Sequence, residues 1–140
     1  METYEEAEAL WGGPTLTLKI TKSDLDPEAV TRRLRLTPTA SAGPGFDPYA
    51  PLSGSDGRWF LDSDTSGRAS QFTTAAGDLL VRLTAASAAI RDLVDEGYSV
   101  QLIVRGYSGP RSTALVAPEV LRRIADLGLP LVVVPSTNER

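Results

Sequence analysis

Hydrophobic and polar residues alternate in three short stretches of the chain, and this period predicts three strands. In the first stretch, over residues 15–21, the leucine and isoleucine side chains face one way and the threonine and lysine side chains face the other. The same period returns over residues 58–62 and over residues 98–107. We expect each strand to bury one face in the core and to expose the other face to water.

Two helices are indicated by their start and stop signals. The first has Asp26 as its N-cap and Pro27 at its first helical position. It ends before Pro38, because the residue before a proline is pushed out of helical geometry. The second helix begins at Pro118 and is closed by Gly128, since glycine accepts the left-handed conformation common at helix ends.

The segment over residues 71–96 has apolar residues at helical spacing along its whole length. One unbroken helix of this length would be a rod of about 39 Å, which is long for so small a domain. We therefore predict a kink or break near Thr84 and a C-terminal stop at Gly97.

The stretch LPLVVVP, residues 129–135, is apolar throughout, which is typical of a strand covered on both faces. The order strand, helix, strand, helical segment, strand, helix, strand predicts a single α+β domain over residues 15–135. We expect a ferredoxin-like arrangement, in which a mostly antiparallel four-stranded sheet carries its helices on one face. Residues 1–14 are predicted to be a flexible acidic segment, and residues 136–140 a frayed tail.

The composition excludes several kinds of chemistry. The chain has no cysteine and no histidine, so it offers no thiolate metal site and lacks the usual general base that activates a serine. The sequence GYSGP around Ser108 is therefore interpreted as a turn rather than as the nucleophile elbow of a hydrolase. We expect a protein that is not an enzyme and needs no cofactor.

The charge and hydropathy of the chain indicate which classes of partner and which cellular location to expect. A net charge of −4 argues against nucleic acid, because phosphate binding needs a basic surface. No apolar run approaches the length of about 18 residues that crosses a bilayer, so no membrane association is expected. The N-terminal segment has the opposite charge to a targeting sequence, which favours a cytoplasmic location.

The sequence DSDTSG resembles the start of a calcium-binding loop. Asp62, Asp64, Ser66 and Gly67 match the positions that supply the first oxygen ligands and the turn. The position of the final bidentate carboxylate is occupied by Thr73, which cannot replace it. We favour a solvated turn that caps the next helix. An enzyme based on the two aspartates is disfavoured, because nothing in the sequence raises the pKa of either carboxyl group.

The face of the sheet opposite the helices is a candidate binding surface. Lys19, Phe60 and Arg105 are its candidate contact residues. Alternation places six residues on this face: Thr17, Lys19, Phe60, Gln101, Ile103 and Arg105. Such a mixture of polar and apolar groups suits a protein partner or a small ligand. The alternative is that the long helical segment covers this face.

The segment over residues 38–57 is rich in proline and glycine, which oppose regular structure. Its large apolar residues Phe46, Tyr49 and Leu52 are candidate anchors for docking onto the domain or onto a partner, since loops often carry binding. The alternative interpretation is a tolerated surface insertion.

Arg32 and Arg33 form a candidate positive patch for an acidic partner or a phosphate, with Lys19 and Lys22 nearby in the sequence. Charged residues usually occupy the solvated side of an amphipathic helix, which is the alternative interpretation.

Several motifs occur in an order that resembles one bacterial family. They are a strand followed by DPEAVTRRL, the sequence LTPT with a following glycine, the tryptophan strand GRWFLDS, and the helix end RRIADLGL. Over about residues 15–135 the chain resembles the family called domain of unknown function four-two-seven-nine. The resemblance implies a small stand-alone cytosolic bacterial protein, and it implies no activity and no site residue. The family pattern has a basic glycine stretch after the PT pair, whereas this loop is neutral to acidic.

Taken together, these observations predict a non-enzymatic binding module that recognises a protein, as an accessory factor or as a neutraliser of a toxin. The alternative is a small-molecule-sensing regulatory domain of ferredoxin-like type. A homodimer formed through the sheet is compatible with either function.

Overall fold

The computed structural model describes residues 12–45, 56–63, 72–107 and 115–136. The elements that these residues form are, in chain order, β1 (Gly12–Lys22), α2 (Pro27–Leu34), β2 (Ala40–Ala42), β3 (Gly57–Asp62), α3 (Phe72–Ala85), α4 (Ser87–Asp95), β4 (Ser99–Tyr107), α5 (Pro118–Leu127) and β5 (Leu131–Ser136). Every strand and helix expected from the sequence is present. Strand β2 is an addition, because it lies in a segment that was expected to have no regular structure.

The strands form one mixed sheet in the order β2-β3-β1-β4-β5. Strand β1 is central and runs antiparallel to both of its neighbours, while β4 and β5 are parallel. The short β2 pairs with β3 over three residues, and the adjacent Thr39 N–H donates to the carbonyl of Phe60 at 2.7 Å. The domain is therefore an α+β fold with a five-stranded sheet rather than the four-stranded sheet expected.

A ferredoxin-like arrangement is not confirmed. In that arrangement, the two strands of each strand-helix-strand unit are parallel and are separated by another strand. Strands β1 and β3, which flank α2, are direct antiparallel neighbours instead. Strands β4 and β5, which flank α5, are parallel but also adjacent. The order of elements along the chain does not determine which strands pair, and the prediction depended on that order alone.

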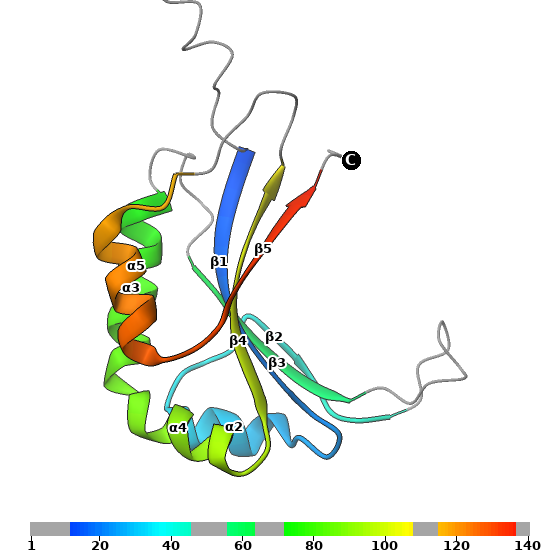
Figure 1. Ribbon diagram of the computed structural model, residues 1–140. Helices are drawn as coiled ribbons and strands as arrows, with labels where there is room; N and C mark the ends of the chain where they lie inside the picture. The colour runs from blue at the N-terminus through cyan, green and yellow to red at the C-terminus, as the bar shows by residue number, and fades with distance from the viewer. Residues whose placement is uncertain (1–11, 46–55, 64–71, 108–114, 137–140) are drawn as a thin grey trace, which may run out of the picture.

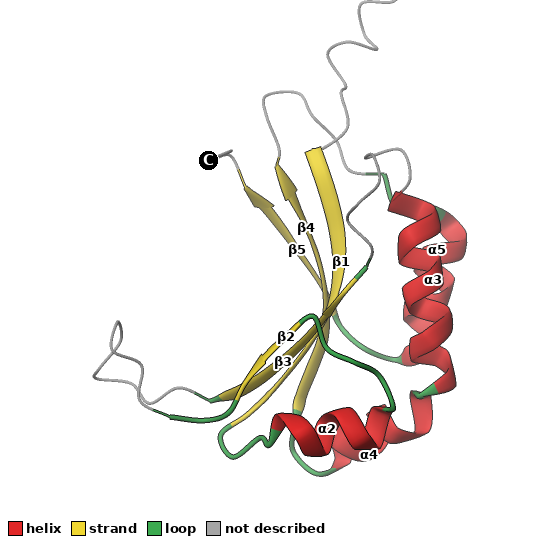
Figure 2. Cartoon of the chain, turned by 180° about the vertical axis from the view of Figure 1, so that it is seen from behind, coloured by secondary structure: helices red, strands yellow, loops and turns green. Residues whose placement is uncertain are grey.

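Figures 1 and 2 show the four helices on one face of the sheet, as predicted. The core lies between this face and the helices. Trp59 is fully buried there, and its Nε1–H donates to Thr31 Oγ1 of α2 at 3.0 Å. The sheet contributes these buried apolar residues to the core: Leu16, Leu18, Ile20, Trp59, Leu61, Val100, Leu102 and Val104. The alternation that predicted the strands also predicted this buried set.

The ends of two helices follow the signals in the sequence. Asp26 is the N-cap of α2, and its Oδ1 accepts a hydrogen bond from the N–H of Glu28 at 3.1 Å. Helix α2 ends at Arg35, a non-glycine residue in the left-handed conformation with φ of 59°. Helix α5 ends at Gly128, whose φ of 71° is the conformation that favours glycine at this position.

The long helical segment is broken where the sequence predicted. Helix α3 ends at Ala85 and α4 begins at Ser87. The hydroxyl of Thr84 donates to the carbonyl of Leu80 at 2.8 Å. A hydroxyl bonded to the carbonyl four residues earlier bends helices, which accounts for a break at this point.

Strand β5 is not covered on both faces, so that prediction is wrong. It lies at an edge of the sheet, and Val133 and Val134 are 55% and 42% exposed. The helices cover one face of the sheet, and an edge strand has a neighbour on one side, so an apolar sequence does not ensure burial here.

Candidate functional site

The face of the sheet opposite the helices, called the open face below, carries most of the residues that the sequence singled out. Residues of α3 and α4 belong to the same buried cluster as Leu16 and Trp59, so the long helical segment packs on the other face. No helix within the described part of the chain covers the open face (Figure 2). Of the two alternatives, the structure supports a sheet face left uncovered by helices.

The strand register sets the positions of side chains on the open face. Lys19 in the central strand lies opposite Phe60 on one side and opposite Gln101 on the other. Arg105 lies further along β4, opposite Thr15. It is four residues from Gln101, a distance of about 14 Å along a strand. The structure therefore brings Lys19 and Phe60 together and places Arg105 on the same face.

The centre of the open face is partly buried and is held by side-chain contacts. Thr17 lies between Asp62 and Ile103, and both Thr17 and Ile103 are buried. The hydroxyl of Thr17 donates to Asp62 Oδ1 at 2.6 Å, and the N–H of Asp62 donates to Thr39 Oγ1 at 2.9 Å. These bonds give Asp62 a structural role at the junction of β1 and β3.

The open face also carries a cation that sequence reasoning missed. Arg58 lies opposite Thr21, on the same face as Phe60, and is exposed. The signal was present, because Arg58 and Phe60 are two residues apart in one strand and so point the same way. Over the described residues, Arg58, Lys19 and Arg105 have no ion pair with a carboxylate. Three cations and the hydrogen-bonded carboxylate of Asp62 make this face positive, although the chain has a net charge of −4.

The chain matches the family described as Domain of unknown function (DUF4279) over residues 14–138, nearly its whole length. It belongs to this family. No curated protein and no solved structure matches the chain. The DUF4279 match confirms the resemblance found in the sequence motifs. Because the family is described as one of unknown function, an argument about function depends on the arrangement of the side chains.

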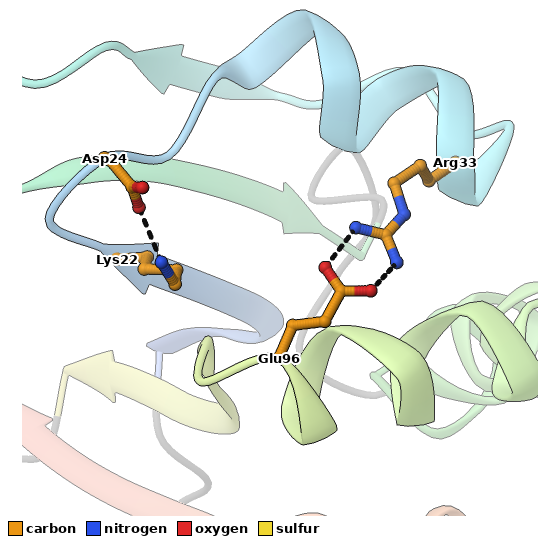
Figure 3. Close-up of polar contacts among 4 residues, drawn as sticks. All are labelled: Lys22, Asp24, Arg33 and Glu96. Carbon is orange, nitrogen blue, oxygen red and sulfur yellow. Dashed lines mark hydrogen bonds and ion pairs between the residues drawn. The ribbon is translucent and has the colours of Figure 1, made fainter.

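In the positive patch predicted from the sequence, Arg32 with Arg33, one of the two arginines already has a carboxylate partner. Arg33 binds Glu96 at the end of α4 with two hydrogen bonds, Nη1 to Oε1 at 2.8 Å and Nη2 to Oε2 at 2.6 Å (Figure 3). Hydrogen bonding to Arg33 lowers the pKa of Glu96, and the bond to Glu96 raises the pKa of Arg33. Arg32 is exposed on the same helix. Because α2 lies on the opposite side of the sheet, neither arginine adds to the open face.

Lys22, at the end of β1, also has a carboxylate partner. Its Nζ contacts Asp24 Oδ1 at 2.7 Å (Figure 3). The same Nζ lies 5.4 Å from the centre of the Tyr98 ring. Hydrogen bonding to Asp24 raises the pKa of Lys22, and the same bond lowers the pKa of Asp24. Of the basic cluster that the sequence suggested, Arg33 and Lys22 are therefore held in separate ion pairs, and Lys19 lies on the open face.

The remaining candidate residues lie outside the described residues. These are the loop anchors Phe46, Tyr49 and Leu52 and the calcium-loop positions Asp64, Ser66 and Gly67. Among the residues that the structure describes, no three acidic side chains lie close enough together to hold a metal ion. The same part of the DUF4279 domain has no helix long and apolar enough to cross a membrane.

A hollow of about 240 Å³ lies on the helical side of the domain. Its walls are formed by Leu34, Arg35, Leu36, Arg82, Ala85 and Ala86, where α2 and α3 end. Pockets that hold small molecules usually have volumes of about 300–1,000 Å³ and bury most of the ligand. This hollow is smaller, and it is lined mainly by apolar side chains with two arginines.

Proposed function

We propose that this DUF4279 domain is a non-enzymatic binding module that recognises an acidic protein surface through its open face. The observation that carries the proposal is the set of cations Lys19, Arg58 and Arg105, which have no ion pair within the described residues although the chain is acidic. A positive patch on a negatively charged molecule selects for a partner of opposite charge and orients its approach.

The dimensions of the open face favour a protein as the partner. From Thr15 to Thr21 the central strand spans about 20 Å at 3.4 Å per residue. Arg58 and Arg105 lie towards the two ends of this span, and Lys19 lies between them, directly opposite the half-buried Phe60. Aromatic side chains and arginines are both enriched in protein interfaces.

Other partner classes are less well supported. A nucleic acid would require more phosphate contacts than three separated cations provide, and it would be repelled by the net charge of −4. A small-molecule sensor of ferredoxin-like type would require an enclosed site, and the hollow beside Arg82 is small. The absence of histidine and cysteine from the sequence supports binding rather than catalysis.

We propose two roles for the module: it acts as an accessory factor for its partner, or it neutralises a partner that is a toxin. The loop residues Phe46, Tyr49 and Leu52 remain predicted contacts. A triple alanine variant of these residues tests whether they strengthen binding at the open face.

The test is affinity capture from a lysate of the source organism, followed by direct titration of the captured protein. The open-face variant is Lys19→Glu with Arg105→Glu. The control variant, Arg122→Glu with Arg123→Glu, makes the same charge change at exposed positions of α5.

We expect an acidic protein that the wild type and the control capture and that the open-face variant loses. The loss of affinity should be about tenfold or more, which corresponds to about 1.4 kcal/mol, and should shrink as salt is added. Equal capture by the open-face variant, or equal loss in both variants, would exclude the open face as the binding site.

A further inference from the structure

The outer edge of β5 presents backbone groups in a pattern that follows from its register with β4. The N–H of Leu102 donates to the carbonyl of Pro130 at 2.9 Å, and Leu102 lies opposite Leu131. In a parallel ladder that starts this way, alternate residues of β5 direct both backbone groups towards β4. Val132 and Val134 are these residues. Leu131, Val133 and Pro135 therefore direct their backbone groups away from the sheet.

These outward groups have no hydrogen-bond partner in the part of the chain that the structure describes. Proline is tolerated in a strand where its position needs no N–H, and Pro135 occupies such an outward position. The edge still offers the N–H and C=O of Leu131, the N–H and C=O of Val133 and the C=O of Pro135.

Strand β5 has one feature that protects exposed edges, Pro135 near its end, but it lacks the charged residues that serve the same purpose. Its sequence LVVVPS contains no charged residue, whereas natural edge strands commonly use lysine or an inward charge to prevent pairing. Val133 and Val134 are also among the exposed large apolar residues of the domain. An uncharged edge of exposed valines is suited to pairing with another strand.

We propose that β5 pairs antiparallel with β5 of a second copy of this chain, about a twofold axis that passes beside Val133. In this register the N–H of each Val133 donates to the C=O of the other Val133. The N–H of each Leu131 donates to the C=O of the other Pro135. The nitrogen of Pro135, which carries no hydrogen, lies opposite the C=O of Leu131 in the other copy. Every outward N–H therefore has an acceptor in this register.

The choice of a second copy follows from the self-complementarity of this edge. A twofold axis requires that one surface patch matches itself, and β5 satisfies this with one strand. In the register centred on Val133, each Val132 lies opposite Val134 of the second copy, so every valine of the strand meets a valine. A register centred on Val132 would instead place Val134 opposite Pro130. The two sheets then form one continuous sheet, with the helices of both copies on the same face.

The first test introduces a single cysteine. Because the chain has no cysteine of its own, any disulfide that forms must join the introduced thiols of two copies. Opposite residues of an antiparallel hydrogen-bonded pair have Cα atoms about 5.5 Å apart, inside the range of about 4.4–6.8 Å that a disulfide spans. Val133→Cys should therefore form a covalent dimer under mild oxidation. Val81→Cys on α3, which is 52% exposed in the wild type compared with 55% for Val133, is the matched control and should form no covalent dimer.

Val132→Cys fixes the register. With the axis at Val133 the two Val132 side chains are displaced from each other along the strands, and we expect no covalent dimer. A covalent dimer from Val132→Cys that forms faster than from Val133→Cys would overturn the proposed register. Equal rates for Val133→Cys and Val81→Cys would overturn the interface itself.

The second test measures the mass of the full chain by size-exclusion chromatography with light scattering over a series of concentrations. The wild type should approach twice the chain mass of 14.9 kDa. Val133→Lys places like charges directly opposite each other and should give the monomer mass, while Val81→Lys should behave as the wild type. Circular dichroism checks that each variant is folded. A wild type that stays at 14.9 kDa throughout, or a folded Val133→Lys variant that remains dimeric, would overturn the proposal.

Discussion

The hydrogen bond between Trp59 and Thr31 joins the sheet to α2, and Thr31→Val removes it with little change of shape. The indole of Trp59 is fully buried, and its Nε1–H donates to the hydroxyl of Thr31 at 3.0 Å. Valine and threonine have similar volumes and similar helix propensities. The substitution therefore isolates the loss of one hydroxyl group.

The expected loss of stability follows from the burial of the two partners. A buried donor left without an acceptor costs about 1–3 kcal/mol. Thr31 is half-buried, so we expect the lower part of that range, about 1–2 kcal/mol. For a chain of 140 residues, an unfolding entropy of about 2.1 cal/mol/K per residue converts this loss into a decrease in Tm of roughly 3–7 °C.

The assay is equilibrium unfolding in urea followed by far-UV circular dichroism, because the second tryptophan of the chain complicates fluorescence. A double-mutant cycle with Trp59→Phe separates the hydrogen bond from other effects, since phenylalanine has no donor. In that background Thr31→Val should cost only a few tenths of a kcal/mol. If Thr31→Val destabilises both backgrounds equally, then the hydrogen bond does not explain the loss and the reasoning is refuted.

Three further predictions concern single sites. Gly57→Ala would place a methyl carbon 2.5 Å from the backbone carbonyl oxygen of Leu25. We expect the free energy of unfolding, measured in urea, to fall by about 1–3 kcal/mol, and an unchanged midpoint would contradict the close approach. Because the folded-state pKa of Glu96 is lowered by Arg33, the ion pair stabilises the fold above the ordinary glutamate pKa of about 4.3, and this stabilisation is lost as the pH falls through the lower folded-state pKa. The Tm difference between wild type and Glu96→Gln should therefore be present at neutral pH and vanish in acid, and a difference independent of pH would rule out this linkage. Gly128→Ala imposes a left-handed conformation on a residue with a Cβ, so thermal unfolding should show a loss of about 1 kcal/mol, and an equal or higher Tm would contradict it.

The local features of this domain were predictable because their causes lie within a few residues of sequence. The alternation over β1 and β3 identified both strands and their buried faces. The break near Thr84 was predicted from the length of the helical segment, and it coincides with a bond to a carbonyl four residues earlier. Strand β2 was missed because its three residues depend on pairing with β3 and carry no period of their own.

The candidate site was predictable to the extent that it depends on strand parity. Lys19, Phe60 and Arg105 share the open face because side chains alternate in strands, and the same rule would have identified Arg58. The interpretation of Arg33 as part of a free patch was wrong. Its partner Glu96 is 63 residues away in the sequence, and no local pattern indicates such a contact.

The sequence by itself determined the elements, their buried sides, the helix ends and the absence of histidine and cysteine chemistry, because each of these depends on neighbouring residues or on composition. The tertiary structure alone decided the pairing order of the strands, the edge position of β5 and the choice of which cations remain without ion pairs. These features depend on contacts between segments far apart in the chain, where small differences in packing energy select one arrangement among several with the same local pattern.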